Sequence, residues 1–353
     1  MRPGWDLTKP CKRNGERGEM KRTALFAVFL AAAVYTSAWL GKEDAKASPG
    51  QMPPAKLNTA ARQRMGPASD SSDEQASLYE EAVAQRQIYR QTRALLPMAQ
   101  QLAKPKQGEW RSLVREPEQD FADYLNESRR VQGVMIVQPI GDLPPDQLNA
   151  IPHLLDAIAH FFGMTAVCYP AIPLDTLPKQ CFRMQYGHRQ INAEYLMGHV
   201  LQPKVKGEVA SVIALTNLDI YPGEQWPFES AYGWSSFNSG TSVLSMNQIL
   251  TPGPADKGQN LLRIVKLSLH ELCHTFTIKH CAKYNCLMNG CGDIEENDSK
   301  PLLLCPDCLA KLSLATGRDP EWHIRSMLEL CKAKGFFQDA NHYYRALTML
   351  KQL

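Results

Sequence analysis

The stretch of sequence that decides the fold is residues 270–308, which contains HELCHTFTIKHC at 270–281, CLM at 286–288 and CPDC at 305–308. His270 and His274 are four residues apart, with Glu271 between them. Residues at i and i+4 lie on the same face of a helix, so both imidazoles can bind one metal ion there. The Glu side chain then reaches a water molecule at that ion. The pattern predicts a helix that carries two zinc ligands and a general base.

His280 is the candidate third ligand, because it follows His274 after six residues. If the chain reverses after the helix, three imidazoles hold the metal and a fourth position stays open for water, as in catalytic zinc sites. The alternative is a helix with two surface histidines, followed by a core methionine at Met288. A bare His-Glu-x-x-His occurs in many proteins that are not hydrolases, but the extended spacing with Met288 is much rarer and favours the metal site.

The extended pattern resembles the metzincin metallopeptidases and, more narrowly, the archaemetzincins. In that family a Cys follows the third His directly, a second Cys and a Met come shortly after, and a C-x-x-C lies downstream. The residues that match these positions are Cys281, Cys286, Met288, Cys305 and Cys308. The resemblance runs from about Gly108 to Gly335.

The resemblance implies an α/β (α+β) fold, with a metzincin-like mixed twisted sheet, an active-site helix and a helical, zinc-stapled C-terminal subdomain. It implies a zinc-dependent metallopeptidase in which His270, His274 and His280 hold the catalytic zinc. Glu271 is then the general base. Met288 forms a hydrophobic floor beneath the site and is not a ligand. A peptide or protein substrate is expected to add as an extra strand to a sheet edge within residues 228–246.

The cysteines predict a second metal site. Cys281 and Cys286, with Cys305 and Cys308, have the separations of a structural Cys₄ zinc site, so we expect two Zn²⁺ per chain and no other cofactor. Disulfides among the same four cysteines are the alternative, because ten cysteines in an extracytoplasmic chain invite pairing. Cys168 and Cys181 are a further possible pair.

One position departs from the family pattern. Thr277 stands where the motif has Gly, which lets the helix end in a sharp turn with positive φ. A β-branched residue is strained in that conformation. We therefore expect that either the turn is reached differently or His280 is displaced. The alternative function is a catalytically weak or inactive, zinc-stabilised peptide-binding module.

The N-terminus predicts targeting out of the cytoplasm. Met20-Lys21-Arg22 precedes an apolar run and then small residues, which is typical of a signal peptide. The rival is an uncleaved anchor, since residues 23–41 are just long enough to span a bilayer. Residues 1–47 are thus a signal peptide or membrane anchor, residues 48–107 a linker and helical N-terminal extension, and residues 108–353 the catalytic domain. Both alternatives predict a secreted, periplasmic or anchored enzyme.

Composition and periodicity complete the expectation. The 353 residues are 44% hydrophobic with a net charge of +3, and no basic block or aromatic–basic run indicates nucleic-acid binding. Apolar runs predict buried strands, and helical spacing predicts the elements between and after them. The expected strands are 131–140, 164–170, 208–216 and 242–246, and the expected helices are 74–104, 144–163, 191–200, 261–276, 302–314, one from 320 and one near 342–350.

Overall fold

The computed structural model describes residues 71–352 except 129–131, 227, 238 and 251–256. These residues fall within one compact unit, Pro53–Leu353. The predicted signal peptide or membrane anchor at 1–47, with its apolar stretch 23–41, lies outside the described residues. Among the helices of the described part, none is long and apolar enough to cross a membrane.

A five-stranded sheet organises the fold, in the order β2-β1-β5-β8-β7. The first four strands of that order are parallel, and β7 runs antiparallel to β8. The predicted mixed sheet is therefore confirmed. The sheet edge expected within residues 228–246 is formed by β7. Strand β8 is the last strand before the predicted active-site helix, and it lies inside the sheet. The strands are β1 (Val134–Ile140), β2 (Ala166–Cys168), β5 (Val209–Thr216), β7 (Gly233–Ser235) and β8 (Thr241–Ser245).

A second, three-stranded sheet follows the order β3-β4-β6. Its strands are β3 (Phe182–Gln185), β4 (His188–Asn192) and β6 (Asp219–Tyr221). The helix predicted over 191–200 is wrong at its start, because Ile191 and Asn192 belong to β4. Asn192 instead caps the helical segment, since its side chain accepts a hydrogen bond from the Tyr195 amide at 2.8 Å. That segment comprises α6 (Ala193–Tyr195) and a π-helical turn, Leu196–Leu201.

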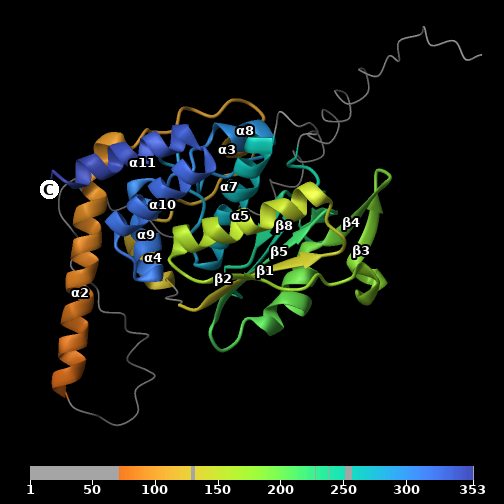
Figure 1. The fold of residues 1–353 in the computed structure, drawn as a ribbon, viewed down its shortest axis with the longest axis horizontal. Helices are drawn as coiled ribbons and strands as arrows, with labels where there is room; N and C mark the ends of the chain where they lie inside the picture. The colour runs from red at the N-terminus through yellow and green to blue at the C-terminus, as the bar shows by residue number, and fades with distance from the viewer. Residues whose placement is uncertain (1–70, 129–131, 227, 238, 251–256, 353) are drawn as a thin grey trace, which may run out of the picture. The chain divides into compact units, whose positions relative to one another are not determined.

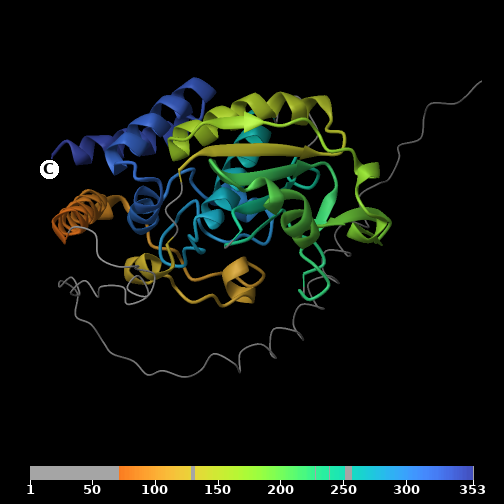
Figure 2. The same ribbon diagram turned by 90° about the horizontal axis from the view of Figure 1, so that it is seen from below.

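Both faces of the large sheet are buried, as alternation along a strand requires. Met135 and Val137 of β1 face a large core that contains α5 (Pro145–Phe162) and α7 (Lys257–Thr275). Ile136 and Ile140 face a smaller core with the helical segment after β4. Figure 2 shows α5 and this segment separated by the strands. The active-site helix α7 is thus held by a sheet on one side and by α5 on another.

The C-terminal helices share the large core and have no separate one. The helices predicted from 320 and near 342–350 are confirmed, and the one predicted over 302–314 is present but begins at Pro306. The helix predicted over 74–104 is wrong at its end, because α2 (Ser71–Ala94) stops before Pro97, which cannot continue a helix. Figure 1 shows α2 beside α9, and the two helices pack together. The remaining helices are α2 (Ser71–Ala94), α3 (Trp110–Leu113), α4 (Phe121–Glu127), α8 (Ile294–Ser299), α9 (Pro306–Thr316), α10 (Pro320–Lys334) and α11 (Phe337–Leu350).

His323 joins this helical region to α5. Its Nδ1 lies 3.0 Å from the Phe161 carbonyl oxygen, to which the neutral ring donates. Its Nε2 is buried without a hydrogen-bond partner. Burial lowers the pKa of His323 to about 4. Below pH ~6.5 the His323 side chain therefore binds a proton in the unfolded chain but not in the folded chain. The free energy of unfolding falls as pH falls through this range, because protonation favours the unfolded chain.

We predict that the difference in unfolding free energy between wild type and His323→Gln falls by about 1 kcal/mol from pH 6 to pH 5, since one titrating group contributes at most ~1.4 kcal/mol per pH unit. Denaturant unfolding at both pH values measures this, and comparison with the variant cancels proton effects elsewhere. A pH-independent difference would contradict the prediction.

Candidate active site and metal centres

Three imidazoles converge at the C-terminal end of α7. His270 and His274 come from the helix and are buried, and His280 comes from the loop after it. The Nε2 atoms of His270 and His274 lie 3.0 Å apart, and those of His270 and His280 lie 3.2 Å apart. Nitrogens on two corners of a zinc tetrahedron are separated by about 3.3 Å, given Zn–N bonds of about 2.05 Å. The predicted residues are brought together with the spacing that zinc needs.

Each ring is oriented by an oxygen acceptor on its far side. His270 Nδ1 lies 2.9 Å from the Leu287 carbonyl oxygen, and His274 Nδ1 lies 2.7 Å from that of Ile278. His280 Nδ1 lies 2.7 Å from Glu116 Oε2. An Nδ1–H that donates to oxygen leaves the Nε2 lone pair free for a metal, which is the usual outer arrangement of zinc-binding histidines. The donor set therefore fits a zinc ion.

The two helical imidazoles are held neutral. Burial lowers the pKa of His274 to about 3, and burial likewise places the pKa of His270 well below its ordinary value. Neutral imidazole is the form that binds zinc. Burial therefore favours the ligand form of both side chains.

Thr277 takes the glycine-like conformation that the family motif requires. Its φ is +65°. The Ile278 amide donates to the Cys273 carbonyl at 3.3 Å, and the Thr277 amide donates to the His274 carbonyl at 2.9 Å. These two bonds form a Schellman helix end with Thr277 at the left-handed position. The expectation of a different turn or a displaced His280 is wrong, because the turn is the glycine type and His280 reaches the other rings.

Glu271 lies against the end strand β7. The Ser235 hydroxyl donates to the Glu271 carboxylate, and it also lies 2.9 Å from the Glu271 carbonyl oxygen. Burial raises the pKa of Glu271 to about 7, although the Ser235 hydrogen bond acts in the opposite direction. A Cβ atom at Gly233 would lie 2.3 Å from Glu271 Oε1. Only glycine therefore lets the strand approach the carboxylate this closely.

Aromatic side chains flank the imidazoles. The Phe237 ring lies 5.3 Å from the His274 ring, and the Trp110 ring lies 5.7 Å from the His280 ring, both edge to face. Phe228 stacks on Trp110. Trp226 is not a core residue, since it is 42% exposed and its indole donates to Glu194 at 2.6 Å. Apolar surface is thus available beside the three rings.

The four predicted cysteines also converge, with their sulfur atoms within 4.8 Å of one another. The Sγ atoms of Cys281 and Cys305 lie 3.8 Å apart, and sulfurs on a zinc tetrahedron are separated by about 3.8 Å. The Cys305 amide donates to Cys286 Sγ at 3.2 Å. Cys305 is the N-cap of α9, and the partial positive charge at the N-terminal end of that helix favours thiolates. All nine cysteines of the described residues are free thiols, including Cys168 and Cys181.

The turn that contains Met288 joins the two clusters. Met288 is fully buried, and its carbonyl oxygen accepts a hydrogen bond from the Cys281 amide at 2.8 Å. Asn289 closes the loop, because its side chain bonds the Cys281 carbonyl at 2.7 Å and the Cys286 amide at 2.9 Å. Since Leu287 also holds His270, one turn fixes an imidazole and two thiols.

Sequence reasoning missed the residues that support the site. Glu116 is 164 positions from His280, and Ser235 and Gly233 are far from α7 in sequence. No spacing rule connects them to the motif. The only available signal for Gly233 was its place in the segment expected to form the sheet edge.

Comparison with known proteins shows similarity to zinc-dependent peptidases. The sequence model of peptidase family M54 matches residues 204–314. Archaemetzincin-2 of Mus musculus is 27% identical over 251 residues, 60% of this chain and 68% of that protein. The archaemetzincin of Pyrococcus furiosus is 23% identical over 195 residues, 53% of this chain and 96% of that protein. The crystal structure of an archaemetzincin from Methanopyrus kandleri matches with a TM-score of 0.44 and 24% identity, covering 53% of this chain and 97% of that one. The resemblance to archaemetzincins is confirmed, and these similarities indicate a zinc metallopeptidase.

We predict that Gly233→Ala lowers peptidase activity by about 100-fold, the scale of a misplaced general base, because the new methyl group displaces Glu271. Zinc content should not change, since Glu271 is outside the imidazole cluster. Gly198→Ala is the matched control, because a Cβ atom there meets nothing within 4 Å. Equal loss of activity in both variants, in a peptide-hydrolysis assay, would contradict this role for Gly233.

Proposed function

We propose that this chain hydrolyses peptide bonds at a zinc ion held by His270, His274 and His280. The observation that carries the proposal is the convergence of three Nε2 atoms, each on a ring whose Nδ1 already has an oxygen partner. Such a set leaves three lone pairs directed at one point. When bound, zinc supplies a Lewis acid that activates water and polarises a carbonyl group.

Glu271 is the general base of the proposed reaction. It follows a ligand histidine on α7, and its carboxylate is buried beside the strand β7. A carboxylate at that place takes a proton from the attacking water and returns it to the nitrogen of the leaving amine. Ser235 orients the carboxylate through its hydroxyl. Glu271 does not belong to the cluster of metal donors, so its role is separable from metal binding.

The proposed substrate is an extended peptide that pairs with β7. This strand ends the five-stranded sheet and lies directly against Glu271. Pairing of a peptide with a strand edge positions its backbone through main-chain hydrogen bonds. Phe237 and Trp110 offer apolar contacts on either side of the imidazoles.

A second, structural zinc is proposed for Cys281, Cys286, Cys305 and Cys308. Four sulfurs and no open position make a closed site, which suits a structural ion. Hydrogen bonds from the other three thiols hold the pKa of Cys281 far below its ordinary value, while burial raises that of Cys286. The thiols therefore do not ionise together without a cation. An extracytoplasmic location, with membrane association through residues 23–41, stays a proposal from the N-terminal sequence.

We predict that Glu271→Gln lowers turnover by about 10²- to 10⁴-fold, as expected for loss of a general base, and keeps both zinc ions. His280→Ala should reduce zinc from two ions per chain to about one, because two imidazoles bind zinc poorly. Elemental analysis and a peptide-hydrolysis assay on the same preparations measure both effects. Wild-type activity in Glu271→Gln would refute the mechanism, and one zinc in the wild type would refute the two-site proposal.

We predict that Cys308→Ser lowers the melting temperature substantially, because structural zinc contributes directly to folding. Cys331→Ser is the control, since Cys331 is also a buried free thiol but lies outside the sulfur cluster. Thermal unfolding with and without a chelator compares the two. Equal melting temperatures for Cys308→Ser and wild type would argue against a structural ion.

A further inference from the structure

The turn before His280 is strained by its own sequence. Among the described residues, only Thr277 and Tyr186 have positive φ without being glycine. An L-residue in this conformation is strained because Cβ approaches the following carbonyl oxygen, and a β-branched side chain is an outlier there. The position persists only if the surrounding structure holds it. Contacts from outside the turn must therefore hold Thr277 in this conformation.

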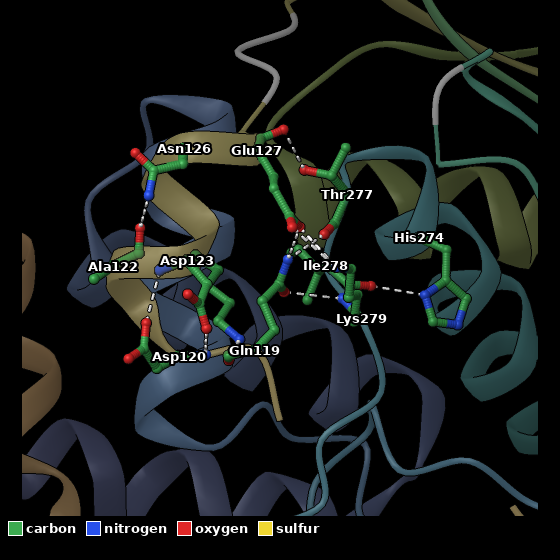
Figure 3. Close-up of polar contacts among 11 residues, drawn as sticks. Gln119, Asp120, Ala122, Asp123, Asn126, Glu127, His274, Thr277, Ile278 and Lys279 are labelled. Atoms are coloured by element: carbon green, nitrogen blue, oxygen red, sulfur yellow. Dashed lines mark hydrogen bonds and ion pairs between the residues drawn. The ribbon is translucent and has the colours of Figure 1, made fainter. Parts of the chain in front are cut away.

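Gln119 provides a two-point contact across this turn. Its Nε2 donates to the Thr277 carbonyl at 3.0 Å, and its Oε1 accepts from the Lys279 amide at 3.1 Å. Figure 3 shows the Gln119 side chain lying against the turn from the start of α4. One planar amide thus bonds the backbone on both sides of Ile278, which fixes the direction of the chain as it leaves the helix.

Gln119 is itself fixed in place. Gln119 is buried, with only 5% of its surface exposed. Its Nε2 also donates to Glu127 Oε2 at 2.9 Å. The Lys311 ammonium group from α9 donates to the Gln119 carbonyl oxygen. Both ends of the amide and its own backbone oxygen therefore have partners, so few other orientations satisfy them. A fixed donor and acceptor can hold a turn that a mobile side chain could not.

Neighbouring residues of α4 complete the contact. The Tyr124 hydroxyl donates to the Phe276 carbonyl at 2.9 Å, and the Thr277 hydroxyl donates to the Glu127 carbonyl at 3.2 Å. The Phe276 carbonyl is among the groups that a helix end leaves without an intrahelical partner. The side chain that strains Thr277 in this conformation thus also carries the hydroxyl for a hydrogen bond that glycine would lack.

The turn controls two of the three imidazoles. The Ile278 carbonyl accepts from His274 Nδ1 at 2.7 Å, and His280 follows Lys279 directly. A shift of residues 277–279 would therefore rotate one ring and move another. The hydrogen bonds of the Gln119 side chain go to Glu127 and to the backbone of Thr277 and Lys279, so its effect on the rings passes through the backbone.

We propose that Gln119 is a positioning residue for the catalytic zinc: its side-chain amide holds the Thr277–Lys279 turn, so that threonine serves at the glycine position and His280 meets His270 and His274. This inference rests on the proposed three-histidine site. Gln119 lies outside the matched family segment 204–314. The chain thus uses a remote residue where the motif uses glycine.

The experiment measures zinc affinity of the full chain by chelator competition, and site geometry by the visible spectrum of the cobalt(II)-substituted protein. Gln119→Ala should weaken binding at the imidazole site by about 10-fold or more, the scale seen when support of a ligand histidine is removed. Its cobalt spectrum should change as well. Asn126→Ala is the matched control, because the Asn126 amide bonds only the Ala122 carbonyl on the same helix, away from the turn (Figure 3).

Rescue separates positioning from general destabilisation. Thr277→Gly should restore most of the zinc affinity in the Gln119→Ala background, because glycine keeps positive φ without the amide. Thr277→Ala should not restore it. If Gln119 only stabilised the segment around α4, the folded fraction of Gln119→Ala would keep the wild-type zinc affinity and cobalt spectrum. Thr277→Gly would then have no loss of zinc affinity to restore.

Each outcome bears on the inference. Weaker binding in Gln119→Ala with rescue by Thr277→Gly supports it. Unchanged affinity and spectrum in Gln119→Ala, with wild-type zinc binding intact, overturn the inference and leave the proposed function standing. A wild-type chain that binds no zinc at the imidazoles overturns the proposed function and the inference together.

Discussion

Everything at this site depends on the chain reversal that follows α7. A rigid helix supplies His270 and His274 at i and i+4, but no helical position can supply a third ring from the same face at the same point. The chain must turn back within a few residues, and the Schellman end at Thr277 accomplishes this. The sheet and α5 fix the helix itself, so the position of His280 relative to the other two rings depends first on this turn.

The second constraint is that the imidazole cluster and the sulfur cluster share one loop. His280 and Cys281 are adjacent, and the turn at 286–289 bonds His270 through the Leu287 carbonyl and Cys281 through the Met288 carbonyl. Disorder in the sulfur cluster would therefore reach the imidazoles within one or two residues. Burial adds to this coupling, since the buried rings of His270 and His274 have little freedom to find other partners. The sulfur cluster beside the imidazoles thus stiffens the part of the site that the helix does not hold.

The features set by local spacing were predictable from the sequence, and the features set by tertiary contacts were not. The i, i+4 histidines, the Cys pairs and the buried strand 208–216 follow from periods that the backbone imposes. Gln119 and Thr277 are 158 residues apart, so only the fold reveals their contact. Local rules rightly identified Thr277 as strained but could not foresee its compensation. The start of the helix at 191 failed for a similar reason, because β4 pairs with the distant β6.

The site also draws on segments well before the family motif. Leu102 donates to the Lys283 carbonyl at 3.0 Å, and the Asn285 amide donates to the Gln100 carbonyl at 2.7 Å, so the chain at 100–102 pairs with the loop between Cys281 and Cys286. Glu116 and Gln119 then reach His280 and its turn. The N-terminal lead-in therefore supports the turn at 277–279, His280 itself and the loop after Cys281, so the motif alone does not define the site.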